Sequence, residues 1–149
     1  TIGSKTRFPS DILRKIDALC ADTAANDPVM TLTLALSYGS RPEIVETVRK
    51  ISAMAVSGAV KIEEIDESLI SRNLYTNDIP DPDLIIRTSG ELRISNFLLW
   101  QIAYSEFYFT DVLWPDFKED DMVRALKDYA GRERRFGKTA EQIRKKESK

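Results

Sequence analysis

The chain has 149 residues, of which 42% are hydrophobic and 31% charged, and its formal net charge is −2. These values are ordinary for a globular protein and allow one domain with a core. The chain has no histidine, which excludes a Ser-His-Asp triad or a histidine-ligated zinc site within it. One cysteine and the lack of a signal peptide or transmembrane run predict a protein of the reducing cytoplasm.

The N-terminal part of the sequence predicts one helix and one strand. Ser10 is the expected N-cap of a helix that runs towards Ala25. Cys20 is predicted to be a core residue, because helical spacing aligns it with Ile12, Leu13, Ile16 and Leu19. Val29–Leu36 is rich in β-forming residues and predicts a strand.

A polar turn at residues 37–41 separates this strand from the next predicted helix. The turn could support an active-site loop, or it could simply connect strand to helix. Pro42 suits the first turn of the helix, which is expected to stop near Gly58. Its predicted buried face consists of Ile44, Val45, Val48 and Ile51.

The remaining elements continue the alternation of helices and strands. A short helix is expected over Asp66–Leu74, a buried strand over Leu84–Ile86, a short strand over Phe107–Thr110 and a last helix over Asp120–Arg132. This alternation predicts an α/β fold in which a parallel sheet is flanked by helices.

A candidate anion site follows the strand that ends before Arg87. Open α/β sheets bind ligands at the carboxyl ends of their strands, and Arg93 and Ser95 follow at the expected start of a helix. Two cations, a hydroxyl and free helix N–H groups together favour a diphosphate ligand. The alternative is that the two arginines pair with Glu91 or Asp83 and hold the loop in place.

The twelve residues Ile94–Ser105 contain no charge and predict a helix that is apolar on all sides. The segment is too short to span a bilayer, which takes about 20 apolar residues. A subunit interface would cover such a helix, and a central position within one domain is the alternative. We expect a homodimer through this helix.

The segments IIRTSGE, RISNFLLWQIAYSEFYFTDVLWPDF and RERRFG form a long and specific signature. It closely resembles the C-terminal signature of the cis-prenyltransferases, especially the bacterial undecaprenyl diphosphate synthases. Weaker similarity over IGSKTRFP and LALSYGSRPEIVETVRK extends the match to almost the whole chain. The resemblance implies that residues 1–149 are the C-terminal portion of a single domain with that family's parallel sheet.

The resemblance implies an enzyme that condenses isopentenyl diphosphate with an allylic diphosphate, such as farnesyl diphosphate. The product would be undecaprenyl or a similar polyprenyl diphosphate, the lipid carrier precursor for cell-wall glycans. By the same resemblance, Arg87, Arg93, Ser95 and the Ile94 backbone hold the diphosphate of isopentenyl diphosphate, and Glu106 is a ligand of Mg2+. Taken without the resemblance, Glu106 is an ordinary ion-pair residue.

Two departures from the family pattern bear on activity. Leu92 stands where some members have a histidine near the metal, so assistance from a histidine is absent at that point. No Asp-Gly-Asn-Arg phosphate loop, which carries the family's catalytic aspartate, occurs in the sequence. We therefore expect no catalytic residue in this chain and no activity of the chain alone.

The C-terminal residues 132–149 are basic, with eight Lys and Arg against three Glu. Arg135 and Gly137 match an Arg-x-Gly pattern that in the family reaches the partner subunit's active site; a basic helix C-terminus is the alternative. Residues 138–149 are expected to form a flexible basic tail, which would suit peripheral contact with the inner face of the membrane. Nucleic acid is not expected as a partner, because the tail lacks interleaved aromatic residues beyond Phe136.

The sequence therefore favours a cis-prenyltransferase, because the segment RTSGELRIS is intact. A non-catalytic subunit of a heteromeric cis-prenyltransferase is the alternative function. A generic phosphate-binding module is a third and weaker interpretation.

Overall fold

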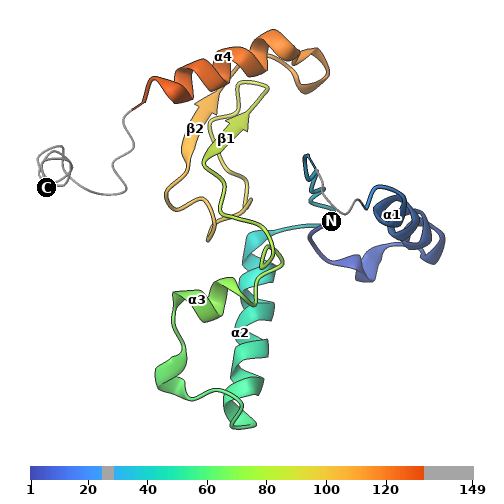
Figure 1. Cartoon of the computed structure of the whole chain (residues 1–149), viewed down its shortest axis with the longest axis vertical. Coiled ribbons are helices and arrows are strands. Elements are labelled where there is room, and N and C mark those ends of the chain that lie inside the picture. The colour runs from blue at the N-terminus through green and yellow to red at the C-terminus, as the bar shows by residue number, and fades with distance from the viewer. Residues whose placement is uncertain (25–28, 133–149) are drawn as a thin grey trace, which may run out of the picture. The chain divides into compact units, whose positions relative to one another are not determined.

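The structure is a computed structural model that describes residues 1–24 and 29–132 (Figure 1). The chain divides into two compact units, Thr1–Pro80 and Asp81–Lys149. Within the described ranges, no helix is long and apolar enough to cross a membrane. The predicted tail 138–149, with Arg135 and Gly137 before it, lies outside the described residues.

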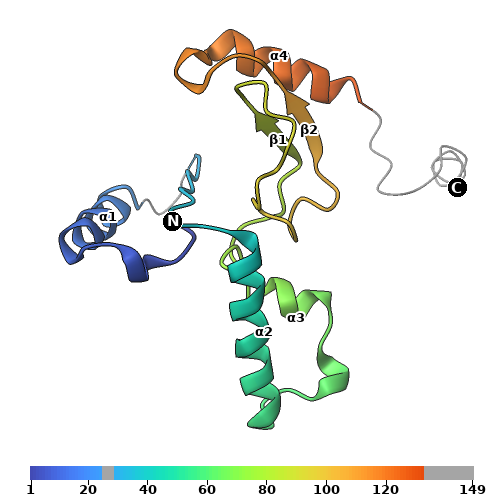
Figure 2. The same ribbon diagram turned by 180° about the vertical axis from the view of Figure 1, so that it is seen from behind.

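The first unit is built around one long helix. Its elements are η1 (Lys5–Arg7), α1 (Ser10–Asp22), α2 (Ser40–Val56), η2 (Ile62–Glu64) and α3 (Glu67–Ser71). α3 lies beside α2 in Figure 1 and in the reverse view of Figure 2. Asp66 caps α3 by accepting a 2.7 Å hydrogen bond from the Leu69 N–H group. The short helix predicted here and the end of α2 near Gly58 are confirmed.

Of the face of α2 predicted to be buried, Ile51 is confirmed as buried, but the rest of the buried face differs from the prediction. Its buried residues are Ser40, Glu43, Thr47 and Ile51. Val45 and Val48, which were expected in the core, are 49% and 57% exposed. The inner side is polar because its groups find partners: the Thr47 hydroxyl, for example, donates to the Asn73 carbonyl at 3.2 Å. A buried polar group that is hydrogen-bonded avoids the cost of an unmade bond.

α1 has no buried residue, and the prediction that Cys20 is a core residue is wrong. Helical spacing identifies the face that a helix could bury, but burial also needs an opposing apolar surface, and Leu19 on this face is 56% exposed. The N-cap is Pro9 and not Ser10, which is the first helical residue and makes no side-chain capping bond.

The segment Val29–Leu36 is not the strand that its composition predicted. In the described part of the chain it forms one isolated parallel bridge, between Ala35 and Ile2. The Ile2 N–H group donates to the Leu34 carbonyl at 3.0 Å. β-forming residues make a strand where a neighbour supplies hydrogen bonds along its length, and here Ile2 supplies them at one end. Val29 at the other end is fully exposed.

The second unit contains a parallel sheet of two strands. Its elements are β1 (Leu84–Arg87), β2 (Glu106–Phe109), η3 (Trp114–Asp116) and α4 (Glu119–Ala130). The strands pair in parallel, with Leu84 opposite Glu106 and Arg87 opposite Phe109. α4 packs against β2, as Figures 1 and 2 both show. The α/β class with a parallel sheet and helices is thus confirmed, as part of a larger fold.

The helix predicted over Ile94–Ser105 is absent, and the segment is a series of turns. Ser95, Asn96 and Leu98 have φ angles of 49°, 62° and 48°, in the left-handed region that a right-handed helix excludes. A helix that is apolar all round needs cover on every side. The described residues of the second unit offer one α-helix and two strands as cover, so Tyr104 is 68% exposed. The dimer was predicted because this segment was expected to be a helix. That basis for the prediction is absent.

Candidate functional site

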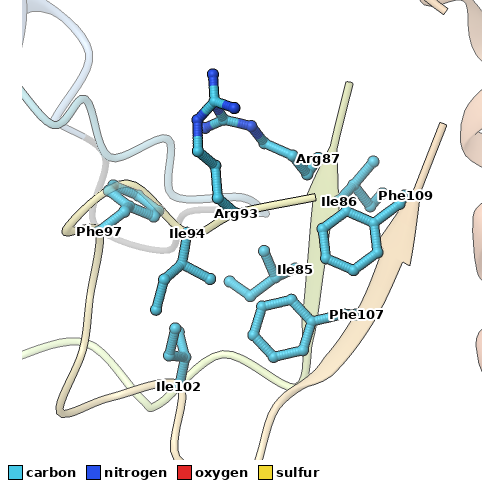
Figure 3. A pocket seen from close by; sticks show the side chains of 9 residues that line it. All are labelled: Ile85, Ile86, Arg87, Arg93, Ile94, Phe97, Ile102, Phe107 and Phe109. Atoms are coloured by element: carbon cyan, nitrogen blue, oxygen red, sulfur yellow. The ribbon is translucent and has the colours of Figure 1, made fainter. Parts of the chain in front are cut away.

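A pocket of about 230 Å³ lies beside the parallel sheet of the second unit. Figure 3 shows the side chains of Arg87 and Arg93 extending to one side of it, away from the apolar residues. The apolar lining comes from both strands and from the turns between them, and includes Ile85, Ile94, Phe97, Ile102, Phe107 and Phe109. The site thus combines a cationic end with an apolar interior.

β2 supplies the aromatic part of the pocket. Phe107 and Phe109 are two residues apart on a strand and therefore project from the same face of the sheet. Their rings stack with centroids 5.8 Å apart and an interplanar angle of 10°. Ile85 is opposite Phe107 in the register of the two strands. The parallel pairing thus gathers apolar side chains from both strands at one pocket.

Arg87 is the last residue of β1 and is half-buried. Its carbonyl accepts a 3.0 Å hydrogen bond from the Thr110 N–H group, which fixes the backbone at the strand end. Its guanidinium has no ion pair or hydrogen bond with any residue that the structure describes. Five N–H donors and a full positive charge at the pocket are therefore available to an anionic ligand.

The turn after β1 is tied to the turn after β2. Ser89 and Gly90 both have left-handed backbone, with φ angles of 69° and 66°. Their N–H groups donate to the carbonyls of Val112 and Thr110 at 2.9 Å each. A β-carbon on Gly90 would lie 3.0 Å from Oδ1 of Asp111, so glycine permits the close approach of the two turns.

Arg93 lies on the turn segment after β1 and forms an ion pair with Glu91. The loop-holding pair that the sequence left open is thus present for Arg93. The Arg93 side chain is 69% exposed, and exposed pairs of this kind contribute about 0–1 kcal/mol. A multiply charged anion can therefore compete for Arg93 at small cost. Ile94 lines the pocket, whereas Ser95 is exposed and is not among the lining residues.

Glu106 lies at the other end of the sheet from Arg87. It begins β2 opposite Leu84, three residues along the register from Arg87, or roughly 10 Å at the usual strand rise. Oε2 of Glu106 accepts a 2.8 Å hydrogen bond from Nη1 of Arg132, and this bond is the main cause that raises the pKa of the Arg132 guanidinium. The structure does not bring Glu106 into the arginine pocket. No group of three or more Cys, Asp or Glu suited to a metal ion occurs among the described residues.

Sequence reasoning missed a polar cluster in the first unit. Glu43 is fully buried, and its Oε1 accepts a 2.7 Å hydrogen bond from the Tyr75 N–H group. The Tyr75 phenol donates to Glu46. Burial, followed by the bond to Glu46, raises the pKa of Tyr75 to about 12. Glu43 and Tyr75 are far apart in the sequence, so no local motif could have predicted the cluster.

The second unit thus combines a cationic strand end with an apolar pocket beside a parallel sheet. Residues 1–137 match the family model described as "Putative undecaprenyl diphosphate synthase". The chain belongs to this family of undecaprenyl diphosphate synthases and isoprenyl transferases.

Individual relatives agree with the family match. The chain is 54% identical over 136 residues to an isoprenyl transferase of Bacillus subtilis, covering 91% of this chain and 52% of the relative. It is 49% identical over 148 residues to an isoprenyl transferase of Porphyromonas gingivalis, covering 99% and 58%. The chain spans about half the length of the curated relatives it matches.

A solved structure supports the fold. The crystal structure of lavandulyl diphosphate synthase from Lavandula x intermedia, in complex with dimethylallyl diphosphate, superposes with a TM-score of 0.85 at 42% identity. The match covers 92% of this chain and 58% of that chain. The described units therefore correspond to part of the fold of that enzyme.

Proposed function

We propose that residues 1–149 are the C-terminal portion of a cis-prenyltransferase domain, and that the pocket binds isopentenyl diphosphate. The complete enzyme would condense this substrate with an allylic diphosphate such as farnesyl diphosphate and make undecaprenyl or a similar polyprenyl diphosphate. The observation that carries the proposal is Arg87, a cation without a partner among the described residues, at the rim of an apolar pocket. A ligand that suits both features has a phosphate end and a hydrocarbon end.

The size of the pocket supports a short hydrocarbon. An apolar cavity of about 150 Å³ holds a benzene molecule, so a pocket of about 230 Å³ can hold a five-carbon isoprenoid group. Burial stabilises such a group by about 0.8 kcal/mol for each CH2. Each charge-assisted hydrogen bond from an arginine to phosphate adds about 1.5–3 kcal/mol. The apolar contacts with the hydrocarbon and the hydrogen bonds to the diphosphate would therefore both contribute to the affinity.

In this proposal Arg87 and Arg93 hold the diphosphate and thereby orient the isopentenyl double bond, which attacks the allylic carbon and then loses a proton. Holding the nucleophile in place lowers the barrier by positioning. The Ile94 backbone and the Ser95 hydroxyl also contact the diphosphate, as the family pattern implies, and the Ile94 side chain, which lines the pocket, contacts the hydrocarbon. Arg135 and Gly137 are proposed, through their match to the family pattern, to reach the partner subunit in a homodimer.

Glu106 is the residue proposed to hold Mg2+. A partly exposed carboxylate is a suitable ligand, because Mg2+ keeps several waters and is commonly bound through one or two carboxylates plus substrate phosphates. The metal would supply neutralisation of diphosphate charge when bound. Because Glu106 and Arg87 are at opposite ends of the sheet, we propose separate positions for the metal and for isopentenyl diphosphate.

The test is steady-state kinetics of the full-length enzyme with Arg87→Ala and Arg93→Ala. We expect Arg87→Ala to raise the isopentenyl diphosphate KM and lower kcat, with a combined loss of ten- to a hundredfold, while farnesyl diphosphate affinity changes less. Arg93→Ala should have a smaller effect, because Arg93 must first leave Glu91. Arg49→Ala, an exposed arginine of the first unit, is the matched control. Unchanged kinetics in the Arg87 variant would overturn the assignment.

A second substitution tests the hydrocarbon end by itself. Ile94→Ser shortens one wall of the pocket and leaves both arginines in place. It should weaken isopentenyl diphosphate several-fold and leave the inhibition constant of inorganic pyrophosphate nearly unchanged. Equal weakening of both ligands would show that Ile94 does not contact the hydrocarbon.

A further inference from the structure

The bridge between Ala35 and Ile2 leaves one edge of the Ala35 segment open. The Leu34 carbonyl accepts from the Ile2 N–H group at 3.0 Å, and the Leu36 N–H group donates to the Ile2 carbonyl at 2.9 Å. Main-chain groups of successive residues in a strand point to opposite edges, so those of Thr33 and Ala35 face away from Ile2. Neither Thr33 nor Ala35 makes a main-chain hydrogen bond to another residue that the structure describes. Their N–H and C=O groups are therefore available to a further strand.

The same segment forms one wall of an apolar groove of about 510 Å³. The groove lies between residues 30–34 and α1, which contributes Ile16 and Leu19 to the lining. Met30 and Leu32 are 78% and 74% exposed, although both side chains are apolar. Contact of such side chains with water is unfavourable, so an apolar cover would stabilise this part of the chain.

The length of the relatives indicates what could supply this cover. The match covers 58% of lavandulyl diphosphate synthase and 52% of the Bacillus subtilis isoprenyl transferase, so between two fifths and one half of each relative lies outside it. If that additional polypeptide belongs to the same domain, it needs a surface on the matched part against which to pack. An open strand edge beside an apolar groove provides both hydrogen bonds and apolar contacts for such packing.

We propose that the open edge at Thr33 and Ala35 receives a β-strand from the N-terminal half of the same domain, and that apolar side chains of that half fill the groove. The inference rests on the proposed placement of residues 1–149 as the C-terminal portion of the domain. Pairing on both edges would give Val29–Leu36 the neighbours that its β-forming composition requires. A second copy of this chain is the alternative occupant, and it would leave the additional polypeptide without this surface.

The first test measures amide hydrogen exchange by nuclear magnetic resonance in two polypeptides. One is the 149-residue chain, and the other has the N-terminal half of the Bacillus subtilis relative joined before Thr1. The N–H groups of Thr33 and Ala35 should exchange about a hundredfold more slowly in the longer polypeptide, because a neighbouring strand then accepts from them. Leu36 is the internal reference: its N–H group is already bonded to Ile2, so its exchange should slow by a smaller factor. Equal exchange of Thr33 and Ala35 in the two polypeptides would overturn the proposal.

The second test places a charge in the groove. Leu32→Asp should lower the thermal midpoint of the longer polypeptide by about 10 °C, because a carboxylate would be buried without a partner. Ile62→Asp is the matched control, since Ile62 and Leu32 are 75% and 74% exposed and Ile62 does not line the groove. Both substitutions should leave the midpoint of the 149-residue chain nearly unchanged. Equal shifts from the two substitutions in the longer polypeptide would refute burial of the groove.

The outcomes separate this proposal from the proposed binding of isopentenyl diphosphate. If Thr33 and Ala35 become protected while Arg87→Ala binds isopentenyl diphosphate like the wild type, strand addition stands and the pocket assignment fails. If Arg87→Ala weakens that binding while Thr33 and Ala35 stay unprotected, only strand addition is refuted. Protection of Thr33 and Ala35 that rises with the concentration of the 149-residue chain alone would identify a second copy as the occupant and would also refute the proposal.

Discussion

The rings of Tyr38 and Tyr75 meet edge to face, with centroids 6.4 Å apart and an interplanar angle of 65°, and both residues donate to Glu43. The Tyr38 phenol reaches Oε2 at 2.6 Å and the Tyr75 N–H group reaches Oε1 at 2.7 Å. Glu43 has no exposed surface. A carboxylate in the first turn of α2 thus joins the turn before the helix to a segment about thirty residues later.

Glu43→Gln should destabilise the chain by about 1–3 kcal/mol, although the side chain keeps its size. An amide accepts through its oxygen alone, so the buried NH2 group would replace a carboxylate oxygen that accepts from the Tyr38 phenol or from the Tyr75 N–H group. Urea denaturation followed by circular dichroism measures the loss. Glu46→Gln is a control on the exposed side of the same helix and should cost less. A Glu43→Gln midpoint equal to that of the wild type would contradict the expectation.

Tyr75 should give the first unit a stability that declines in strong alkali. Burial and the bond to Glu46 raise its pKa from 10.0 to about 12, so the folded state holds the phenolic proton more tightly than the unfolded state. This contribution is complete below pH 10 and is lost as the pH rises through 12. The difference between the ultraviolet titrations of wild type and Tyr75→Phe isolates this phenol, and Glu46→Gln should lower its pKa. A Tyr75 transition near pH 10 would contradict the prediction.

Gly90→Ala should destabilise the second unit by about 1–2 kcal/mol through left-handed strain, with a further cost from the contact to Asp111. Asp111→Ala removes the contact and leaves the strain, so the double variant should be more stable than the sum of the two single effects predicts. Thermal unfolding of the four proteins gives this comparison. If the two effects on stability are strictly additive, the Asp111 side chain can move away from the new methyl group without a loss of stability.

The 149-residue chain alone should incorporate no labelled isopentenyl diphosphate into lipid, even with Mg2+ and farnesyl diphosphate. In our proposal the chain holds one diphosphate, whereas bringing two reactants together contributes about 7–11 kcal/mol in favourable cases. Adding the N-terminal half of the Bacillus subtilis relative as a separate chain should restore turnover if the halves associate. Clear multi-step elongation by the chain alone would refute the absence of catalytic groups.

The elements that sequence reasoning predicted well are those whose ends are chemically marked. The run Leu84–Ile86 is followed by a charged residue, Arg87, which the structure adds as the last residue of β1. The short helix expected near Asp66 begins directly after this residue, so both elements could be located from the local sequence. The position of Arg87 at the edge of the sheet could be predicted in the same way, from the end of the strand. The residues that line the pocket could not be predicted, because Ile85 and Phe107 meet through strand pairing that no local sequence pattern encodes.

The failures share one cause, which is that apolar periodicity does not identify the opposing surface. Val45 and Val48 have helical spacing, but the surface that α2 meets offers hydrogen-bond partners and selects Glu43 and Thr47 instead. The segment Ile94–Ser105 has the composition of a buried helix without enough neighbours to bury it. A hydrophobic pattern shows which residues would be stabilised by burial. Whether they are buried depends on the surfaces that the rest of the fold places against them.

The backbone hydrogen bonds of Ser89 and Gly90 determine how the strand end can recognise an anion. Because both N–H groups are already used on Val112 and Thr110, the turn presents side-chain charge to a ligand without a cradle of main-chain donors. Attraction by exposed charge is screened by ions, with a Debye length of about 8 Å in physiological saline. If the pocket binds isopentenyl diphosphate as we propose, raising the ionic strength should therefore weaken the contacts of the arginines with the diphosphate. The contacts of Phe107 and Phe109 with the hydrocarbon should remain almost unchanged.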